Sequence, residues 1–186
     1  DYIVLWSALR KQPYFTNNAA NVGYTWWSHD IGGHMLGIRD DELYLRWVQY
    51  GVFSPINRLH SSNSDLSGKE PWSYRADVDH FATEALKFRH KLIPYIYTMN
   101  YKTHTEGRAI CEPMYYAYPD EKDAFKVKNQ YMFGSELMVC PIVSRINKNT
   151  GTAAVKAWLP HGRWTDIFTG QVCRGDIFGG LFRGES

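Results

Sequence analysis

Residues 24–61 read YTWWSHDIGGHMLGIRDDELYLRWVQYGVFSPINRLHS, and the order of elements in this stretch decides the fold. Residues 24–28 are a short β-prone run, and residues 52–58 are a second one, which its proline weakens. Between them, residues 40–50 predict a helix with an aspartate cap. A strand–helix–strand unit places its two strands in parallel, almost always with a right-handed crossover. The stretch therefore predicts parallel β/α packing.

Polar residues follow both predicted strands, with Asp30 after the first and His60 after the second. The C-terminal ends of parallel strands lie at one edge, where β/α barrels build their active sites. We therefore expect Asp30 and His60 to open onto one face, within reach of a common pocket. A carboxylate among tryptophans fits carbohydrate chemistry. Two plainer interpretations stay open: Asp30 as a turn residue before two glycines, and His60 as a structural histidine.

A metal centre is not indicated by the sequence. A zinc site built from His29, His34 and His60 is disfavoured, because there is neither a His-Glu-x-x-His motif nor a cysteine pair. The three cysteines are widely spaced and give no disulfide framework.

Outside the central stretch the pattern changes near Gly107. Before it, residues 6–21 predict one helix, and the segment from Asp77 to Gly107 predicts another, which Pro94 should kink or divide. After it, short strand candidates alternate with turns, as in a sandwich, at residues 109–118, 137–144, 153–159 and 164–168. We expect two parts, residues 1–107 and residues 108–186.

Composition narrows the class of protein. Of 186 residues, 44% are hydrophobic and 16% aromatic, which suits a packed core and the stacking of flat apolar ligand faces. The net charge is +2 and no basic run occurs, so nucleic acid is not an expected partner. No apolar stretch reaches about 18 residues, so neither a transmembrane helix nor a membrane partner is expected. The first residues lack the basic region of a signal peptide.

Several motifs in a fixed order resemble glycoside hydrolase family 31, the family of α-glucosidases and α-xylosidases. They are WWSHDIGGH (26–34), ELYLRWVQYGVFSP (42–55), RLHS (58–61) and EPW (70–72). Further matches are LIPYIYT (92–98), EPM (112–114), QYMFG (130–134) and LPHGRW (159–164). The resemblance runs from residue 1 to about residue 175.

The resemblance implies an α/β fold: the last strands and helices of a (β/α)8 TIM barrel over residues 1–107, then an incomplete β-sandwich segment over residues 108–186. It implies a retaining α-glycosidase for α-linked glucosides, without a metal or organic cofactor. Asp1, with Trp6 and Leu9 at the family spacing, resembles the acid/base. The family's nucleophile motif, Trp-x-Asp-Met-Asn-Glu, is not found, so we expect the nucleophile upstream and the isolated chain to be inactive.

The resemblance also implies sugar contacts. Asp30 and His60 resemble family residues that hydrogen-bond sugar hydroxyls, and Trp27 and His34 are expected to line the same substrate site. His34 stands where many members have phenylalanine, which leaves the sugar open. The alternatives are a non-catalytic carbohydrate-binding or scaffold fragment, and α-xylosidase, α-galactosidase or transglycosylase activity. The sequence leaves linkage, cellular compartment and oligomeric state open.

Overall fold

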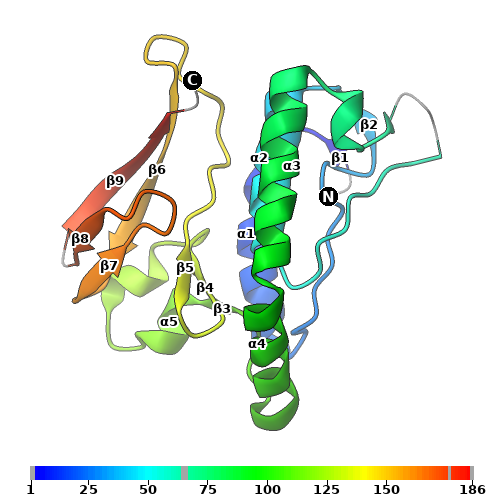
Figure 1. The fold of residues 1–186 in the computed structure, drawn as a ribbon. Coiled ribbons are helices and arrows are strands. Elements are labelled where there is room, and N and C mark those ends of the chain that lie inside the picture. Colours follow the sequence, from blue (N-terminus) through cyan, green and yellow to red (C-terminus); the bar gives the residue numbers. More distant parts are fainter. Residues whose placement is uncertain (1–2, 64–66, 176, 185–186) are drawn as a thin grey trace.

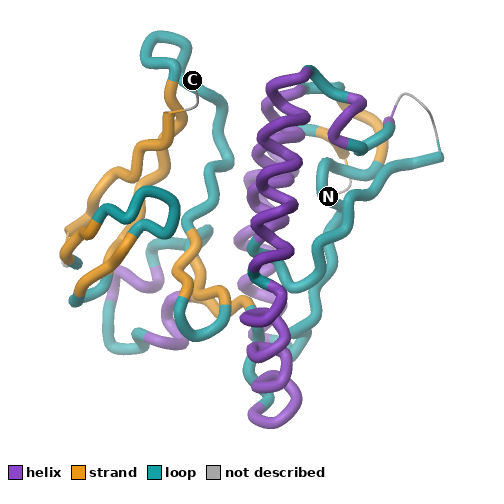
Figure 2. The backbone as a smooth tube through the Cα atoms, viewed as in Figure 1, coloured by secondary structure: helices purple, strands orange, loops and turns teal. Residues whose placement is uncertain are grey.

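The computed structural model describes residues 3–63, 67–175 and 177–184. Helices α1 to α4 lie together, and the antiparallel strands of the C-terminal part lie beside them (Figure 1). Long loops connect the helices on the side away from these strands (Figure 2).

No helix in the described ranges has the length and apolar character needed to cross a membrane. In chain order the elements are β1 (Ile3–Val4), α1 (Trp6–Asn21), β2 (Met35–Gly37), α2 (Asp41–Val52), η2 (Pro71–Ser73), α3 (Ala76–Lys91), α4 (Ile93–Glu106), β3 (Cys111–Pro113), α5 (Met114–Ala117), η3 (Lys122–Phe125), β4 (Tyr131–Phe133), β5 (Leu137–Val139), β6 (Thr152–Leu159), β7 (Arg163–Thr165), β8 (Val172–Arg174) and β9 (Ile177–Gly184).

Helix α2 begins where the sequence predicts, at an aspartate cap. The Asp40 carboxylate accepts a hydrogen bond from the Leu43 N–H at 3.0 Å, which satisfies one of the free donors of the first turn. The same carboxylate accepts from the Trp6 indole at 3.0 Å and from Arg145 at 2.7 Å. One side chain thus ties α2 to α1 and to the loop before β6.

The other predicted helices are confirmed, with one correction. The helix predicted at the start of the chain is α1. The long predicted helix divides at Leu92 into α3 and α4, and Pro94 lies in the first turn of α4, where a missing N–H is tolerated. Gly107 ends α4 with a φ of 71°. Arg75, rather than Asp77, is the cap of α3, and Asp77 accepts hydrogen bonds from the Arg75 guanidinium.

The two strands predicted on either side of α2 do not form. Residues 24–30 form no strand, and the ring of Trp27 packs instead against Phe15 of α1, with 4.9 Å between ring centroids. The prediction for residues 52–58 is wrong: α2 continues to Val52, residues 53–56 form a turn, and residues 57–58 have no regular structure. Pro55, which has no N–H to donate, lies in the turn that follows.

The segments before and after α2 nevertheless lie parallel to each other, paired over fewer residues than the sequence predicts. Ile31 and Leu59 form a parallel bridge, in which the Ile31 N–H donates to the Arg58 carbonyl at 3.2 Å and the His60 N–H donates to the Ile31 carbonyl at 3.3 Å. Strand β1 also pairs in parallel with β2. The residues on either side of this bridge therefore run in the same direction.

The C-terminal part is built from antiparallel strands. Strands β3, β4 and β5 form one sheet in that order, β6 pairs with β9, and β7 pairs with β8. The strands predicted at residues 137–144, 153–159 and 164–168 overlap β5, β6 and β7. The run predicted at residues 109–118 contains only β3 before it turns into α5, and the sequence pattern misses β4, β8 and β9.

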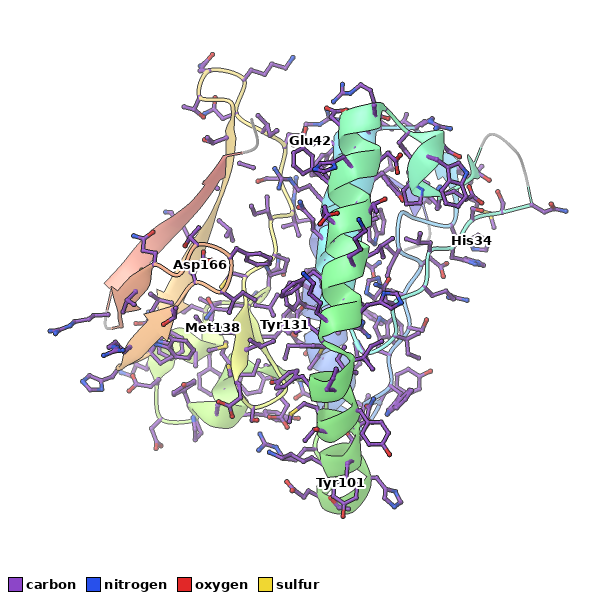
Figure 3. The ribbon with its side chains drawn as sticks, viewed as in Figure 1. His34, Glu42, Tyr101, Tyr131, Met138 and Asp166 are labelled. Carbon is purple, nitrogen blue, oxygen red and sulfur yellow. The ribbon has the colours of Figure 1, made fainter. Side chains whose placement is uncertain are left out.

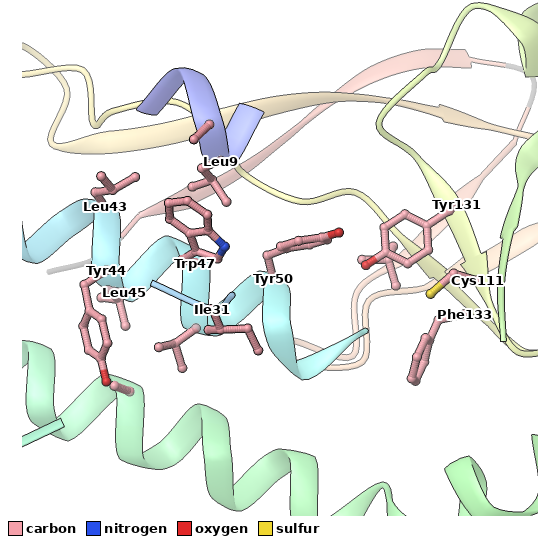
Figure 4. Close-up of a cluster of buried hydrophobic side chains, with 14 of the residues drawn as sticks. Leu9, Ile31, Leu43, Tyr44, Leu45, Trp47, Tyr50, Cys111, Tyr131 and Phe133 are labelled. Carbon is pink, nitrogen blue, oxygen red and sulfur yellow. The ribbon is translucent and has the colours of Figure 1, made fainter. Parts of the chain in front are cut away.

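One hydrophobic cluster runs through both parts of the chain (Figure 4). Leu9 of α1 and Trp47 of α2 are fully buried in it, and Tyr131 of β4 is buried in the same cluster. Residues on both sides of Gly107 therefore share a core.

The turn after α2 places four consecutive carbonyls, those of residues 52–55, against donors from distant elements. The guanidinium of Arg89, on α3, donates to the carbonyls of Val52, Ser54 and Pro55 at 2.6, 2.6 and 3.0 Å. The hydroxyl of Tyr131, on β4, donates to the Phe53 carbonyl at 2.7 Å. The first of these carbonyls belongs to the last residue of α2 and the other three to the turn after it, and the two side chains give them hydrogen-bond donors.

Replacing Arg89 by lysine should destabilise the protein. Lysine keeps the charge but cannot reach three carbonyls with one planar group. We expect Arg89→Lys to lower the free energy of unfolding by about 2–3 kcal/mol, measured by urea denaturation. The matched control is Arg10→Lys, at an exposed position of α1, with an expected change within about 0.5 kcal/mol. Equal effects of the two substitutions would contradict the role of Arg89.

Candidate active site

A tight turn presents the first two residues of the site. The Gly33 N–H donates to the Asp30 carbonyl at 2.9 Å, and Gly32 and Gly33 have φ values of 91° and 80°, which side chains rarely allow. A Cβ added at Gly32 would lie 2.6 Å from Cδ of Lys69. The turn therefore requires glycine, and it brings the Asp30 Oδ2 and His34 Nδ1 atoms to 3.5 Å.

His60 joins these two side chains from the segment beyond the parallel bridge. The rings of His34 and His60 lie 4.4 Å apart between centroids. One side-chain N or O atom from each of Asp30, His34 and His60 lies within 4.8 Å of those of the other two. The side chains of Asp30 and His34 are 21% and 29% exposed, so a ligand can reach them. His34 lies on the side of the helices away from the C-terminal strands (Figure 3). The predicted proximity of Asp30 and His60 is confirmed.

Arg58 is a member of the site that the sequence analysis did not select. Its Nη2 donates to Oδ1 of Asp30 at 2.5 Å. The pair holds the carboxylate in one orientation and leaves Oδ2 facing His34. The spacing could have indicated Arg58. Residues two apart in an extended segment point to the same side, and Arg58 comes two residues before His60.

His29, which the sequence groups with Asp30, points elsewhere. It is buried, its ring stacks on that of Tyr50 at 4.7 Å, and neither ring nitrogen has a hydrogen-bond partner in the described residues. Burial, and to a smaller extent the charge of Arg58, lowers the pKa of His29 to about 3. His29 is therefore a neutral core residue.

Trp27 packs against other aromatic rings and not, in the contacts that the structure describes, against Asp30, His34 or His60. Its ring contacts Phe15 at 4.9 Å and Tyr24 at 5.6 Å between centroids. The side chain is half-buried, which leaves part of the indole open to solvent. Asp1, the expected acid/base, lies outside the described residues.

A cavity of about 440 Å³ lies next to the cluster but is not centred on it. It is lined by residues of η2, of α3 and of the segment after the bridge, among them Leu59, Ser61 and Trp72. His60 stands between two of these in the chain and contacts His34 instead. We place the site at the polar cluster because the carboxylate and the two imidazoles are there.

The cluster offers an acceptor for hydroxyl groups in the Asp30 carboxylate, and imidazole nitrogens that donate or accept. Comparison with known proteins then identifies the family. The sequence model of the glycosyl hydrolases family 31 TIM-barrel domain matches residues 1–99, and that of the family 31 C-terminal domain matches residues 107–180. The chain belongs to glycosyl hydrolase family 31. It covers the C-terminal part of the family 31 barrel and the domain that follows it.

Curated family 31 relatives include hydrolases of two named kinds. An alpha-xylosidase of Saccharolobus solfataricus is 29% identical over 91% of this chain and 23% of its own length. The neutral alpha-glucosidase C of Mus musculus is 30% identical over 83% of this chain and 16% of its own length. The chain thus spans about a fifth of the length of these relatives.

Solved family 31 structures share the fold. A GH31 alpha-xylosidase from a soil metagenome, complexed with xylose, superposes with a TM-score of 0.86 and 30% identity over 97% of this chain and 29% of its own. The cycloalternan-forming enzyme of Listeria monocytogenes, in complex with a pentasaccharide substrate, gives a TM-score of 0.88 and 27% identity, over 100% of this chain and 18% of its own.

The buried His29 should make this family 31 chain sensitive to acid. The pKa of His29 is about 3 when folded and 6.5 as the ordinary value, so in between the unfolded chain binds a proton that the folded state excludes. Stability is therefore lost as the pH falls from 6.5 toward 3.

We expect His29→Phe, which keeps a ring on Tyr50, to reduce the loss of unfolding free energy between pH 7 and pH 5 by on the order of 1–2 kcal/mol. Urea denaturation at the two pH values measures it. The control is the exposed His104, replaced in the same way, which should leave the pH dependence unchanged. An identical pH dependence in His29→Phe and the wild type would refute the assignment.

Proposed function

We propose that the chain is part of a retaining α-glycosidase that hydrolyses α-linked glucosides. In this proposal residues 1–107 end the catalytic barrel and residues 108–186 begin the next domain. The observation that supports it best is the cluster of Asp30, His34 and His60 beyond a parallel bridge, in a chain of family 31. The enzyme's remaining barrel, including the nucleophile, would come from sequence outside these residues.

The cluster is proposed to hold one sugar ring. Asp30 has one carboxylate oxygen engaged by Arg58, and its other oxygen is available to accept from a sugar hydroxyl. His60 would donate to or accept from a neighbouring hydroxyl, with His34 beside it. Trp27 would offer the open part of its indole to the apolar face of the sugar. A site of this kind discriminates strongly against a sugar that lacks the bonded hydroxyl.

Asp1 is proposed to be the general acid and base. In the first step a carboxylate from elsewhere in the barrel attacks the anomeric carbon while Asp1 gives its proton to the leaving oxygen, and a glycosyl-enzyme ester forms. In the second step Asp1 takes a proton from water, the water oxygen attacks the anomeric carbon, and the ester bond breaks. The two carboxyl groups stand about 5–5.5 Å apart in retaining enzymes.

The role of Asp1 can be tested in the full-length enzyme by changing the leaving group. Asp1→Ala should lower kcat/KM by about 100-fold or more for an alkyl α-glucoside, whose leaving oxygen needs a proton, and much less for a nitrophenyl α-glucoside. Equal losses on both substrates would show that the acid lies elsewhere. Full-length protein that binds α-glucosides but turns over neither would favour the non-catalytic carbohydrate-binding alternative.

The role of Asp30 can be tested by removing its charge. Asp30→Asn in the full-length enzyme should lower kcat/KM by about 10- to 100-fold, the effect of losing a hydrogen bond to a charged group. Asp77→Asn is the matched control, because it breaks a comparable exposed pair with Arg75 on α3 and should leave kcat/KM unchanged. Comparing nitrophenyl α-glucoside with α-xyloside in the same assay decides between the two sugars. A kcat/KM equal to the wild type in Asp30→Asn would remove this residue from the site.

A further inference from the structure

We propose that Asp30, His34 and His60 also bind one divalent transition-metal ion, such as Zn²⁺ or Co²⁺. One carboxylate and two imidazoles are a donor set that these ions accept, and their N and O atoms already lie within 4.8 Å of one another. Three protein ligands leave further coordination positions for water. The zinc site that the sequence disfavours had His29 in place of Asp30, and the fold excludes His29 by burying its ring against Tyr50.

The backbone pre-organises these three ligands. Asp30 and His34 stand at the two ends of the glycine turn, with Oδ2 and Nδ1 3.5 Å apart. His60 is held by the parallel bridge, through its own N–H to the Ile31 carbonyl. To bind one ion, the side chains must bring these donors, now within 4.8 Å of one another, to about 2.0–2.2 Å from the metal.

Arg58 has two opposing effects on this site. It hydrogen-bonds Oδ1 of Asp30 and so orients the other oxygen, as the outer partners of metal-ligating carboxylates do. Its positive charge weakens the attraction for a cation that binds by charge alone. We therefore expect Zn²⁺ and Co²⁺, which form strong bonds to imidazole, to bind, and Mg²⁺, which prefers oxygen ligands, to bind poorly.

The ion and a sugar would use the same atoms of Asp30 and His60. Resting on the proposed function, we infer that the metal competes with the substrate and inhibits the enzyme. Phenylalanine, which many family members have where this chain has His34, cannot bind a metal. We therefore expect inhibition by the metal to depend on His34.

Direct titration of the protein with Co²⁺ tests metal binding without any sugar or activity. Visible absorption reports coordination by nitrogen and oxygen, and near-ultraviolet bands would report cysteine thiolates instead. We expect one equivalent to bind without thiolate bands. His34→Phe, which keeps a ring beside His60, and Asp30→Asn should each weaken binding at least tenfold. His104→Phe, outside the cluster, should bind as the wild type does. Circular dichroism confirms that each variant is folded.

The outcomes separate the two proposals. Wild-type affinity in both His34→Phe and Asp30→Asn, or a spectrum dominated by thiolate bands, would overturn the metal site. If methyl α-glucoside lowers the apparent Co²⁺ affinity of the wild type, both the metal site and the sugar site are supported. If Co²⁺ binding requires Asp30 and His34 but saturating glucoside leaves it unchanged, the metal site stands and the inferred competition is overturned.

Discussion

The arrangement of this chain depends on satisfying four carbonyls in the turn after α2. Backbone carbonyls inside a protein need hydrogen-bond donors, and those of residues 52–55, the last residue of α2 and the turn that follows it, are in that position. Arg89 of α3 donates to three of them and Tyr131 of β4 to the other, which the Cys111 thiol also contacts. The segment that leaves this turn carries Arg58 and His60 into the site, so a helix of the first part and a strand of the second both determine where these side chains lie.

The site combines rigidity in the backbone with partial exposure of its side chains. Two left-handed glycines and one parallel bridge position Asp30, His34 and His60, while the side chains of Asp30 and His34 keep about a fifth to a third of their surface open. Arg58 holds the carboxylate in one orientation, which suits hydrogen bonds to hydroxyls. The same orientation also presents one oxygen toward two imidazoles. The proposed sugar site and the proposed metal site thus use the same side chains.

Helical periodicity, caps and glycine stops predicted α1, α2 and the division between α3 and α4, because these signals act within one or two turns of the chain. The strands around α2 were predicted wrongly for the opposite reason. A strand is stabilised by hydrogen bonds to a neighbouring strand. Between these two segments the pairing is limited to a single bridge between Ile31 and Leu59. Strands β4, β8 and β9 were missed because their pairing partners, not their own patterns, define them.

For the site, the sequence by itself determined the residue types and their order: an acidic residue before two glycines, and a histidine after the next apolar run. It also carried the family motifs, which several segments in fixed order make specific. Tertiary structure alone decided which polar side chains meet. His29 and Asp30 are neighbours in the chain, yet one is buried on Tyr50 and the other pairs with Arg58. Burial and pairing depend on residues that are distant in the sequence and close in the folded structure, and the local sequence does not specify which residues these are.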